Sequence, residues 1–274
     1  FLSYFAHPDG SFGGIYGSRA TRIYYPAAAE LLRERIELAG TLADWMRPAI
    51  RKQATVTLSA IDTPNLSPVF NNYCQALLAN QGDDLLSPFS PAPVGRSMLT
   101  EAGLLVDVGP RHHSVISTRK AVICHWHRGK KLVDDCGLAF EMTNGGYATS
   151  QGDPDTSSSL ESDRLIIQGR LSRRKIPLPN PYNMLVLRLL SVTVMRVPRV
   201  AAVIKQMIAG LLVEARGKYI GKFRREITLG PELHVRDSWE PRDLSRISIN
   251  APFSVIHMAS SGYWQKSDTE ASES

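Results

Sequence analysis

The stretch SVISTRKAVICHWHRGKKLVDDCG, residues 114–137, sets the character of the second half of the chain. Its short runs of β-branched residues are separated by Gly and Asp turns, a pattern typical of antiparallel strands. Similar runs occur in GLLVDVG (103–109) and DRLIIQGRLSRRKIPL (163–178), whereas KFRREITLGPELHVRDSW (222–239) alternates apolar and polar residues. We expect FSVIHMASSGYW (253–264) to add another strand. Together these patterns predict an antiparallel β-sandwich.

The first part of the chain is helical in character instead. Pro26 opens PAAAELLRERIELAGTLADW (26–45), in which Leu and Ile residues recur roughly on one face, and Pro48 is expected to end or kink this helix. A second helix is predicted from Ser67–Pro68 to residue 80, with Ser67 as its cap. Residues 81–97 are polar and rich in Pro and Gly, which indicates a linker. The fold class is therefore predicted to be α+β.

A long apolar segment, residues 184–219, interrupts the β pattern and is helical in character. Pro198 breaks it, and basic residues are too frequent in it for a membrane-spanning helix. Two interpretations stay open: a basic amphipathic helix on a membrane surface, or a helical hairpin packed on the β domain. We expect a helical domain over 1–97 and a β domain over 98–274 that carries this insert. The basic residues of the segment are Arg188, Arg196, Arg199 and Lys205 among others.

The net charge of +6 is concentrated in the middle of the chain. Residues 111–225 hold 20 Lys and Arg against 8 Asp and Glu, which indicates an anionic partner or a solvated basic face. We expect no nucleic acid, because the basic residues are not interleaved with aromatic ones. Cys74, Cys124 and Cys136 form no CxxC pair, which excludes a four-cysteine zinc site. The chain begins with Phe1 and not Met, so we expect a fragment.

The opening stretch HPDGSFGGIYGSRATRIYYP, residues 7–26, combines a turn, four glycines, three tyrosines and two arginines. PDG is a strong turn signal, and the glycines would let a bulky ligand approach the backbone. The same composition also suits an ordinary loop that enters a helix, with tyrosines that pack and arginines that are solvated. The residues alone leave both interpretations open.

This stretch resembles the heparinase II/III-like polysaccharide lyases and lyase-like proteins. Residues 118–137 and 223–239 resemble strands of that family's sandwich. The resemblance implies the last helices of an incomplete α/α toroid followed by an antiparallel β-sandwich, with earlier toroid helices missing from this chain. It also implies a bacterial periplasmic or membrane-associated cell-envelope location, whereas the cysteine usage is equally compatible with the cytoplasm. The residues that carry it are Asp9, Gly10, Ser11, Phe12, Tyr16, Arg19, Tyr24 and Tyr25.

The activity implied by the resemblance is β-elimination in an anionic, uronate-containing polysaccharide. An arginine fork would neutralise the sugar carboxylate, and a tyrosine would act as base or acid. A neighbouring guanidinium lowers the pKa of a phenol, which would make tyrosine a better base. The implied catalytic residues are Tyr16, Tyr24 and Tyr25, and the implied substrate-binding residues are Asp9, Ser11, Arg19 and Arg22.

Two further expectations come from the same resemblance. Some family members bind zinc through His and Asp of the sandwich, and His125 and His127 would share one side of a strand. However, HHSVISTRK (112–120) replaces the usual histidine–aspartate stretch, and these histidines also suit a strand surface. No other cofactor is expected. The alternative function is a non-catalytic relative that binds or assembles an exopolysaccharide at a membrane, touching its surface through residues 184–219.

Overall fold

In the described part of the chain, three α-helices precede two antiparallel sheets, so the predicted α+β class is confirmed. Among the helices of the described residues no toroid is evident. The helical elements are η1 (Leu2–Phe5), α1 (Ala27–Leu31), α2 (Glu37–Arg51) and α3 (Thr63–Ala79). The computed structural model describes residues 1–17, 22–61, 63–79, 91–142, 147–151, 155–174, 218–241 and 244, with scattered positions between 182 and 203.

The single helix predicted over residues 26–45 is two helices, α1 and α2, because the chain folds back between them. Glu30 of α1 is buried and accepts a 2.7 Å hydrogen bond from Nε of Arg47 in α2. In one continuous helix these residues would lie about 25 Å apart along the axis. Arg33, in the connection, also binds Asp44 of α2. The break therefore allows a buried carboxylate to meet its cation.

Two prolines that were predicted to lie at helix boundaries lie inside helices instead. α2 continues past Pro48, because the packing of neighbours such as the fully buried Met46 offsets the missing backbone hydrogen bond. α3 begins at Thr63, earlier than the predicted Ser67, and Pro68 lies inside it. The predicted start at Ser67 was therefore wrong, and Pro48 does not end its helix, whereas the kink at Pro48 stays a prediction.

The first sheet has five strands in the order β1-β2-β3-β4-β5. The strands predicted over 103–109 and 114–137 are confirmed. The linker was predicted over residues 81–97, but its last three residues belong to β1, so the prediction was wrong there. Residues 81–90 lie outside the described residues. The strands are β1 (Gly95–Leu99), β2 (Leu104–Val108), β3 (His112–Ser117), β4 (Val122–His127) and β5 (Lys130–Asp135).

The second sheet has six strands in the order β11-β10-β9-β7-β6, and β8 also pairs with β9. The strands predicted within 163–178 and 222–239 are confirmed. The predicted strand at 253–264 lies outside the described residues, as does most of the segment 184–219. The strands are β6 (Ala139–Glu141), β7 (Tyr147–Thr149), β8 (Ser157–Glu161), β9 (Arg164–Arg174), β10 (Lys218–Thr228) and β11 (His234–Glu240).

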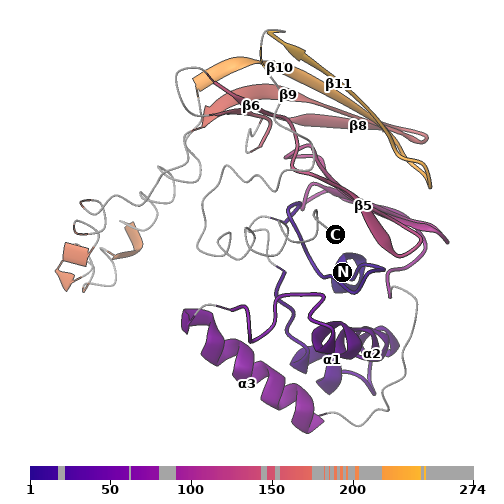
Figure 1. The fold of residues 1–274 in the computed structure, drawn as a ribbon, viewed down its shortest axis with the longest axis vertical. Coiled ribbons are helices and arrows are strands. Elements are labelled where there is room, and N and C mark those ends of the chain that lie inside the picture. Colours follow the sequence, from indigo (N-terminus) through magenta and orange to yellow (C-terminus); the bar gives the residue numbers. More distant parts are fainter. Residues whose placement is uncertain are drawn as a thin grey trace.

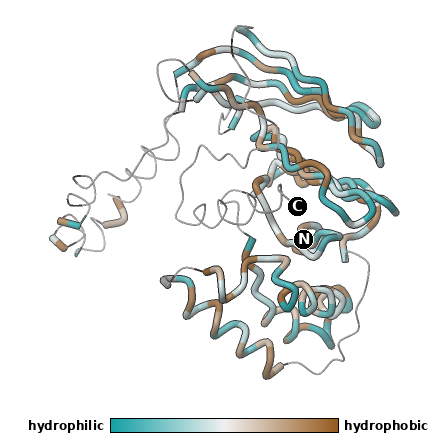
Figure 2. The backbone as a smooth tube through the Cα atoms, in the orientation of Figure 1, coloured by the Kyte–Doolittle hydropathy of each residue, from teal (hydrophilic) through white to brown (hydrophobic). Residues whose placement is uncertain are grey.

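The elements form successive layers, in which the first sheet lies between the second sheet on one side and the opening stretch and helices on the other (Figure 1). One core lies between the sheets and contains Leu105 and Ile123 from the first sheet and Ile167 from the second. A second core joins the other face of the first sheet to the opening stretch, and a third joins that stretch to the helices. Polar and apolar residues alternate along the strands of the second sheet, one face of which is left to solvent (Figure 2).

A buried arginine ties the two sheets together. Arg225 of β10 is fully buried, and its Nη2 lies 2.8 Å from an Asp135 carboxylate oxygen of β5. Its Nε and Nη2 donate to both carboxylate oxygens of Asp237 in β11, at 2.7 and 2.9 Å. Nη1 donates to the carbonyl oxygen of Ala121, before β4. One guanidinium therefore bridges both sheets.

Candidate functional site

The opening stretch packs on the face of the first sheet that points away from the second sheet. Phe5 and Tyr16 stack at 5.5 Å and belong to the same core as Cys124 and Trp126 of β4. His7 stacks on the Trp126 indole with ring centroids 3.8 Å apart. The stretch is therefore part of the folded interior and not a loose surface loop.

A continuous chain of hydrogen bonds runs through this stretch. The Tyr16 hydroxyl lies 2.8 Å from His7 Nε2, and His7 Nδ1 lies 2.9 Å from Ser11 Oγ. Ser11 Oγ donates to Asp9 Oδ1 at 2.6 Å, and Trp126 Nε1 donates to Asp9 Oδ2 at 2.7 Å. The Ser11 hydroxyl donates its hydrogen to Asp9, so it can only accept a hydrogen bond from His7 Nδ1–H. His7 Nε2 then carries no hydrogen and accepts one from the Tyr16 hydroxyl. The chain fixes one tautomer of a neutral imidazole.

Burial sets the protonation states of the central pair. Burial first, then the charges of His113, Lys131 and Arg22, lowers the pKa of His7 well below 6.5. Burial also raises the pKa of Tyr16 well above 10, although the Arg22 guanidinium acts in the opposite direction. Tyr16 is therefore a hydrogen-bond donor at neutral pH and not a phenolate.

The other predicted tyrosines differ from each other. Tyr24 is buried, and burial first, then the Glu30 carboxylate, raises the pKa of its phenol. Its hydroxyl has no hydrogen-bond partner in the described part of the chain. Tyr25 is 45% exposed at the surface. The predicted catalytic tyrosines are thus two buried phenols and one exposed one.

Three of the predicted substrate-binding residues, Asp9, Ser11 and Arg22, form hydrogen bonds or ion pairs with other residues of the protein. Asp9 and Ser11 lie near the surface and bind each other as well as Trp126 and His7. The Arg22 guanidinium lies 3.6 Å from the Asp134 carboxylate of β5. Arg19 lies outside the described residues. The structure therefore brings Asp9, Ser11 and Tyr16 together around His7, which the sequence did not single out.

The predicted zinc ligands lie on the opposite face of the first sheet. His125 and His127 pair with Ser114 and His112 of β3, and His125 Nδ1 lies 2.8 Å from Ser114 Oγ. Burial, followed by the charges of His112 and His127, lowers the pKa of His125 to about 4. Among the described residues, no three His, Cys, Asp or Glu side chains gather closely enough to hold a metal ion. The two histidines therefore have no third ligand there.

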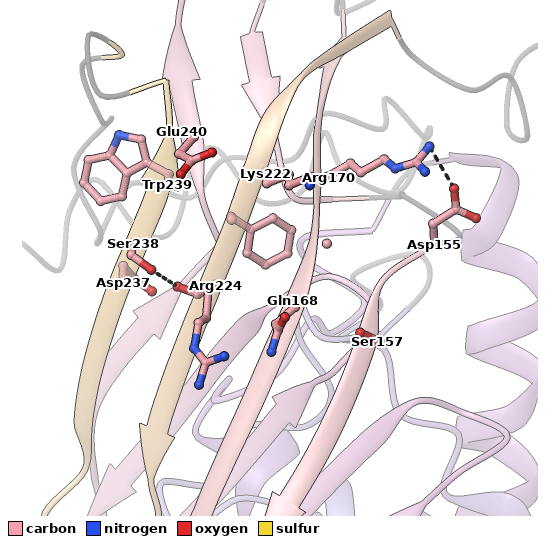
Figure 3. A pocket seen from close by; sticks show the side chains of 12 residues that line it. Asp155, Ser157, Gln168, Arg170, Lys222, Arg224, Asp237, Ser238, Trp239 and Glu240 are labelled. Atoms are coloured by element: carbon pink, nitrogen blue, oxygen red, sulfur yellow. Dashed lines mark hydrogen bonds and ion pairs between the residues drawn. The ribbon is translucent and has the colours of Figure 1, made fainter.

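A groove of about 830 Å³ lies on the outer face of the second sheet (Figure 3). Cross-strand pairing places Gln168 of β9 beside Arg224 of β10, which pairs in turn with Ser238 of β11. The next row pairs Arg170 with Lys222. The exposed side chains that line the groove are Asp155, Ser157, Gln168, Arg170, Lys222, Arg224, Ser238 and Glu240.

Two of the three cations of the groove, Arg170 and Arg224, form surface ion pairs. Arg170 lies 3.2 Å from the Asp155 carboxylate, as Figure 3 shows, and Arg224 Nε lies 2.8 Å from Glu226. Lys222 has no ion-pair partner within the described residues. Such exposed pairs contribute about 0–1 kcal/mol, so their cations remain available to a ligand.

Sequence reasoning missed this groove although its signal was present. The alternation in KFRREITLGPELHVRDSW places Lys222, Arg224 and Ser238 on one face of a hairpin, but their partners on β9 are more than 50 residues away in sequence. In the described part of the chain, no helix has both the length and the apolar character needed to cross a membrane. Comparison with protein-family models, with curated proteins and with solved structures gives no match.

Proposed function

We propose that the protein binds an anionic, uronate-containing polysaccharide along the outer face of the second sheet. The observation that carries this proposal is the groove in which Arg170, Lys222 and Arg224 stand beside neutral hydrogen-bonding side chains. Neighbouring strands lie about 4.8 Å apart, and residues two apart on a strand lie about 6.8 Å apart. One sugar carboxylate at the centre therefore meets at least two of the three cations.

The neutral side chains suit the remainder of a sugar ring. Ser157, Gln168 and Ser238 lie on three different strands of the same face and offer hydroxyl and amide groups to sugar hydroxyls. Arginine pairs with a carboxylate through two parallel hydrogen bonds, whereas Lys222 acts as a point charge. A hydroxyl-rich polymer with regularly placed carboxylates matches this combination of groups.

Reversing the charge at Lys222 tests the proposal. Hydrogen bonds to charged groups contribute about 1.5–3 kcal/mol, so we expect Lys222→Glu to weaken binding of an oligouronate about tenfold to a hundredfold. Lys222→Gln removes the charge without placing a second carboxylate opposite Glu240, and we expect a smaller loss. Binding is measured by calorimetry at two salt concentrations.

The matched control is Lys130→Glu, which makes the same charge change at an exposed position of β5. We expect this variant to bind like the wild type, and a neutral glucan of the same length not to bind. Equal losses of affinity in the Lys130 and Lys222 variants would mean that net charge, not the groove, causes the effect, which would contradict the proposal. Absence of binding by the wild type would also contradict it.

We also propose a lyase-like ancestry, on the resemblance of residues 9–25 described above. In that proposal α1, α2 and α3 are the last helices of a toroid, and the two sheets are the family's β-sandwich. The order of the elements, helices followed by two antiparallel sheets with a shared core, supports it. β-Elimination is the second candidate function, favoured by the 2.8 Å contact between Tyr16 and His7, which would form an acid–base pair.

We nevertheless expect binding without cleavage, because Tyr16 and His7 are buried and neutral. A panel of uronate polymers should therefore give no ultraviolet absorbance from unsaturated product. The informative variants are Tyr16→Phe, which removes the buried hydroxyl, and Tyr25→Phe, which removes an exposed one. Product formation that is lost in the Tyr16 variant and kept in the Tyr25 variant would establish a lyase and contradict this expectation.

A further inference from the structure

Residues 4–17, which include the first part of the opening stretch, form the layer that joins the helices to the first sheet. Ala6 belongs to the core of the helices, whereas Phe5 and Tyr16 belong to the core on the first sheet. Phe12 packs against both cores. Whatever controls the docking of residues 4–17 therefore controls the contact between the helices and the sheet.

Side chains of the sheet hold this segment by directed hydrogen bonds. His113 Nε2 donates to the Tyr4 carbonyl oxygen at 3.0 Å, and the Tyr4 hydroxyl lies 3.0 Å from Ser97 Oγ. Trp126 Nε1 donates to the Asp9 carboxylate at 2.7 Å. The segment is thus attached through β1, β3 and β4, which belong to one sheet.

Two neutral histidines lie in the middle of this contact. The His7 and His113 rings are 5.5 Å apart, and both contact the Trp126 indole. Within the described residues, His113 Nδ1 is buried without a hydrogen-bond partner. A proton on that nitrogen would be buried without an acceptor, and a second charge on His7 would repel the first. Protonation therefore opposes docking on geometric grounds alone.

The other charged and titratable groups around the pair do not remove this penalty. Lys131 and Arg22 disfavour a charge on His7, whereas Asp9 favours one on His113. Burial outweighs Asp9 and lowers the pKa of His113 to about 4. The groups that act on the pair from its own side of the sheet are Asp9 and Tyr16 of the stretch, Lys131 of β5 and Arg22, and Cys124 and Asp134 act on the neighbouring Tyr16. His112 and His125 act on His113 from the opposite face of the sheet.

We propose that residues 4–17 form a latch that acid opens, because protonation of His7 and His113 releases the segment while the core between the two sheets stays folded. The docked segment binds fewer protons than the released one, since both pKa values are lowered on docking. Docking is therefore complete above pH 6.5 and weakens as the pH falls toward 4. This inference is independent of the proposed glycan groove.

Hydrogen exchange on the whole protein tests the latch between about pH 4.5 and 7.5, a range that includes complete docking above pH 6.5 and its weakening at lower pH. After correction for intrinsic exchange rates, we expect the opening constant of residues 4–17 to rise more steeply than tenfold per pH unit, because two protons are bound. Residues 165–171 of β9, in the core between the sheets, should keep their protection over the same range.

Variants separate the latch from general acid instability. His113→Gln keeps an N–H donor for the Tyr4 carbonyl but does not titrate, so the pH dependence should fall to about tenfold per unit. His234 is an exposed histidine of β11, and His234→Gln should leave the pH dependence of the opening constant unchanged. Loss of protection in residues 4–17 and 165–171 at the same pH, or the same slope in the His113 variant, would overturn the proposal.

Discussion

Replacing Arg225 with Ala is expected to lower the free energy of unfolding by about 3–5 kcal/mol, the usual cost of removing one partner from a buried ion pair. The Arg225 side chain is fully buried, and its partners Asp135 and Asp237 are nearly so. The substitution would leave two carboxylates in the interior without their cation. The Ala121 carbonyl oxygen would also lose its donor.

Urea denaturation followed by circular dichroism measures this effect, and the chain offers a matched control. Arg224 is the next residue on β10 but lies on the exposed face, so Arg224→Ala should change the free energy of unfolding by no more than about 0.5 kcal/mol. Arg225→Lys keeps the charge but loses the planar fork, so its loss of unfolding free energy should lie between those of Arg225→Ala and Arg224→Ala. Equal effects at positions 224 and 225 would contradict the bridge between the sheets.

Replacing Trp126 with Ala is expected to cost about 3–5 kcal/mol, as is typical when a large aromatic side chain is removed from a core. The indole is fully buried, stacks on His7 and donates to Asp9. Its loss removes both the apolar contact and the hydrogen bond that attach the opening stretch to β4.

Trp126→Phe separates the two contributions by thermal and urea unfolding. Phenylalanine keeps a ring against His7 but cannot donate to the Asp9 carboxylate, so we expect a loss of about 1.5–3 kcal/mol. A Trp126→Ala protein as stable as the wild type would mean that the opening stretch is not docked on the sheet as described.

The strands were largely predictable because each carries its own signal. β2, β9 and β10 coincide with runs of β-branched or alternating residues that have Gly or Asp at one end or both. The alternation of KFRREIT even places Arg225 on the apolar face with Phe223 and Ile227, which is a visible sign of a buried cation. Local periodicity therefore determines both the element and the face that each residue occupies.

What the sequence could not predict depends on contacts between distant residues. The break between α1 and α2 follows from the pairing of Glu30 with Arg47, and β1 forms only because Gly95–Leu99 pairs with β2. The predicted helix and linker in these places followed local composition, which tertiary pairing overrode.

The opening stretch shows the same limit at the candidate site. The sequence analysis singled out its residues as a candidate site, but their contacts depend on Trp126, which is 117 residues from Asp9 in the chain. Whether a tyrosine is a good base depends on burial, and sequence alone does not reveal that Tyr16 and Tyr24 are inside. The groove likewise needs four strands to be aligned before its cations gather.

Cross-linking of a bound oligouronate by a carbodiimide tests the central claim most directly, because the reagent joins a sugar carboxylate to a lysine amine in contact with it. Mass spectrometry of the digested protein then locates the adduct. The glycan groove predicts an adduct at Lys222 that excess unmodified oligouronate suppresses. An adduct at Lys131, beside the opening stretch, with none at Lys222, would contradict this account.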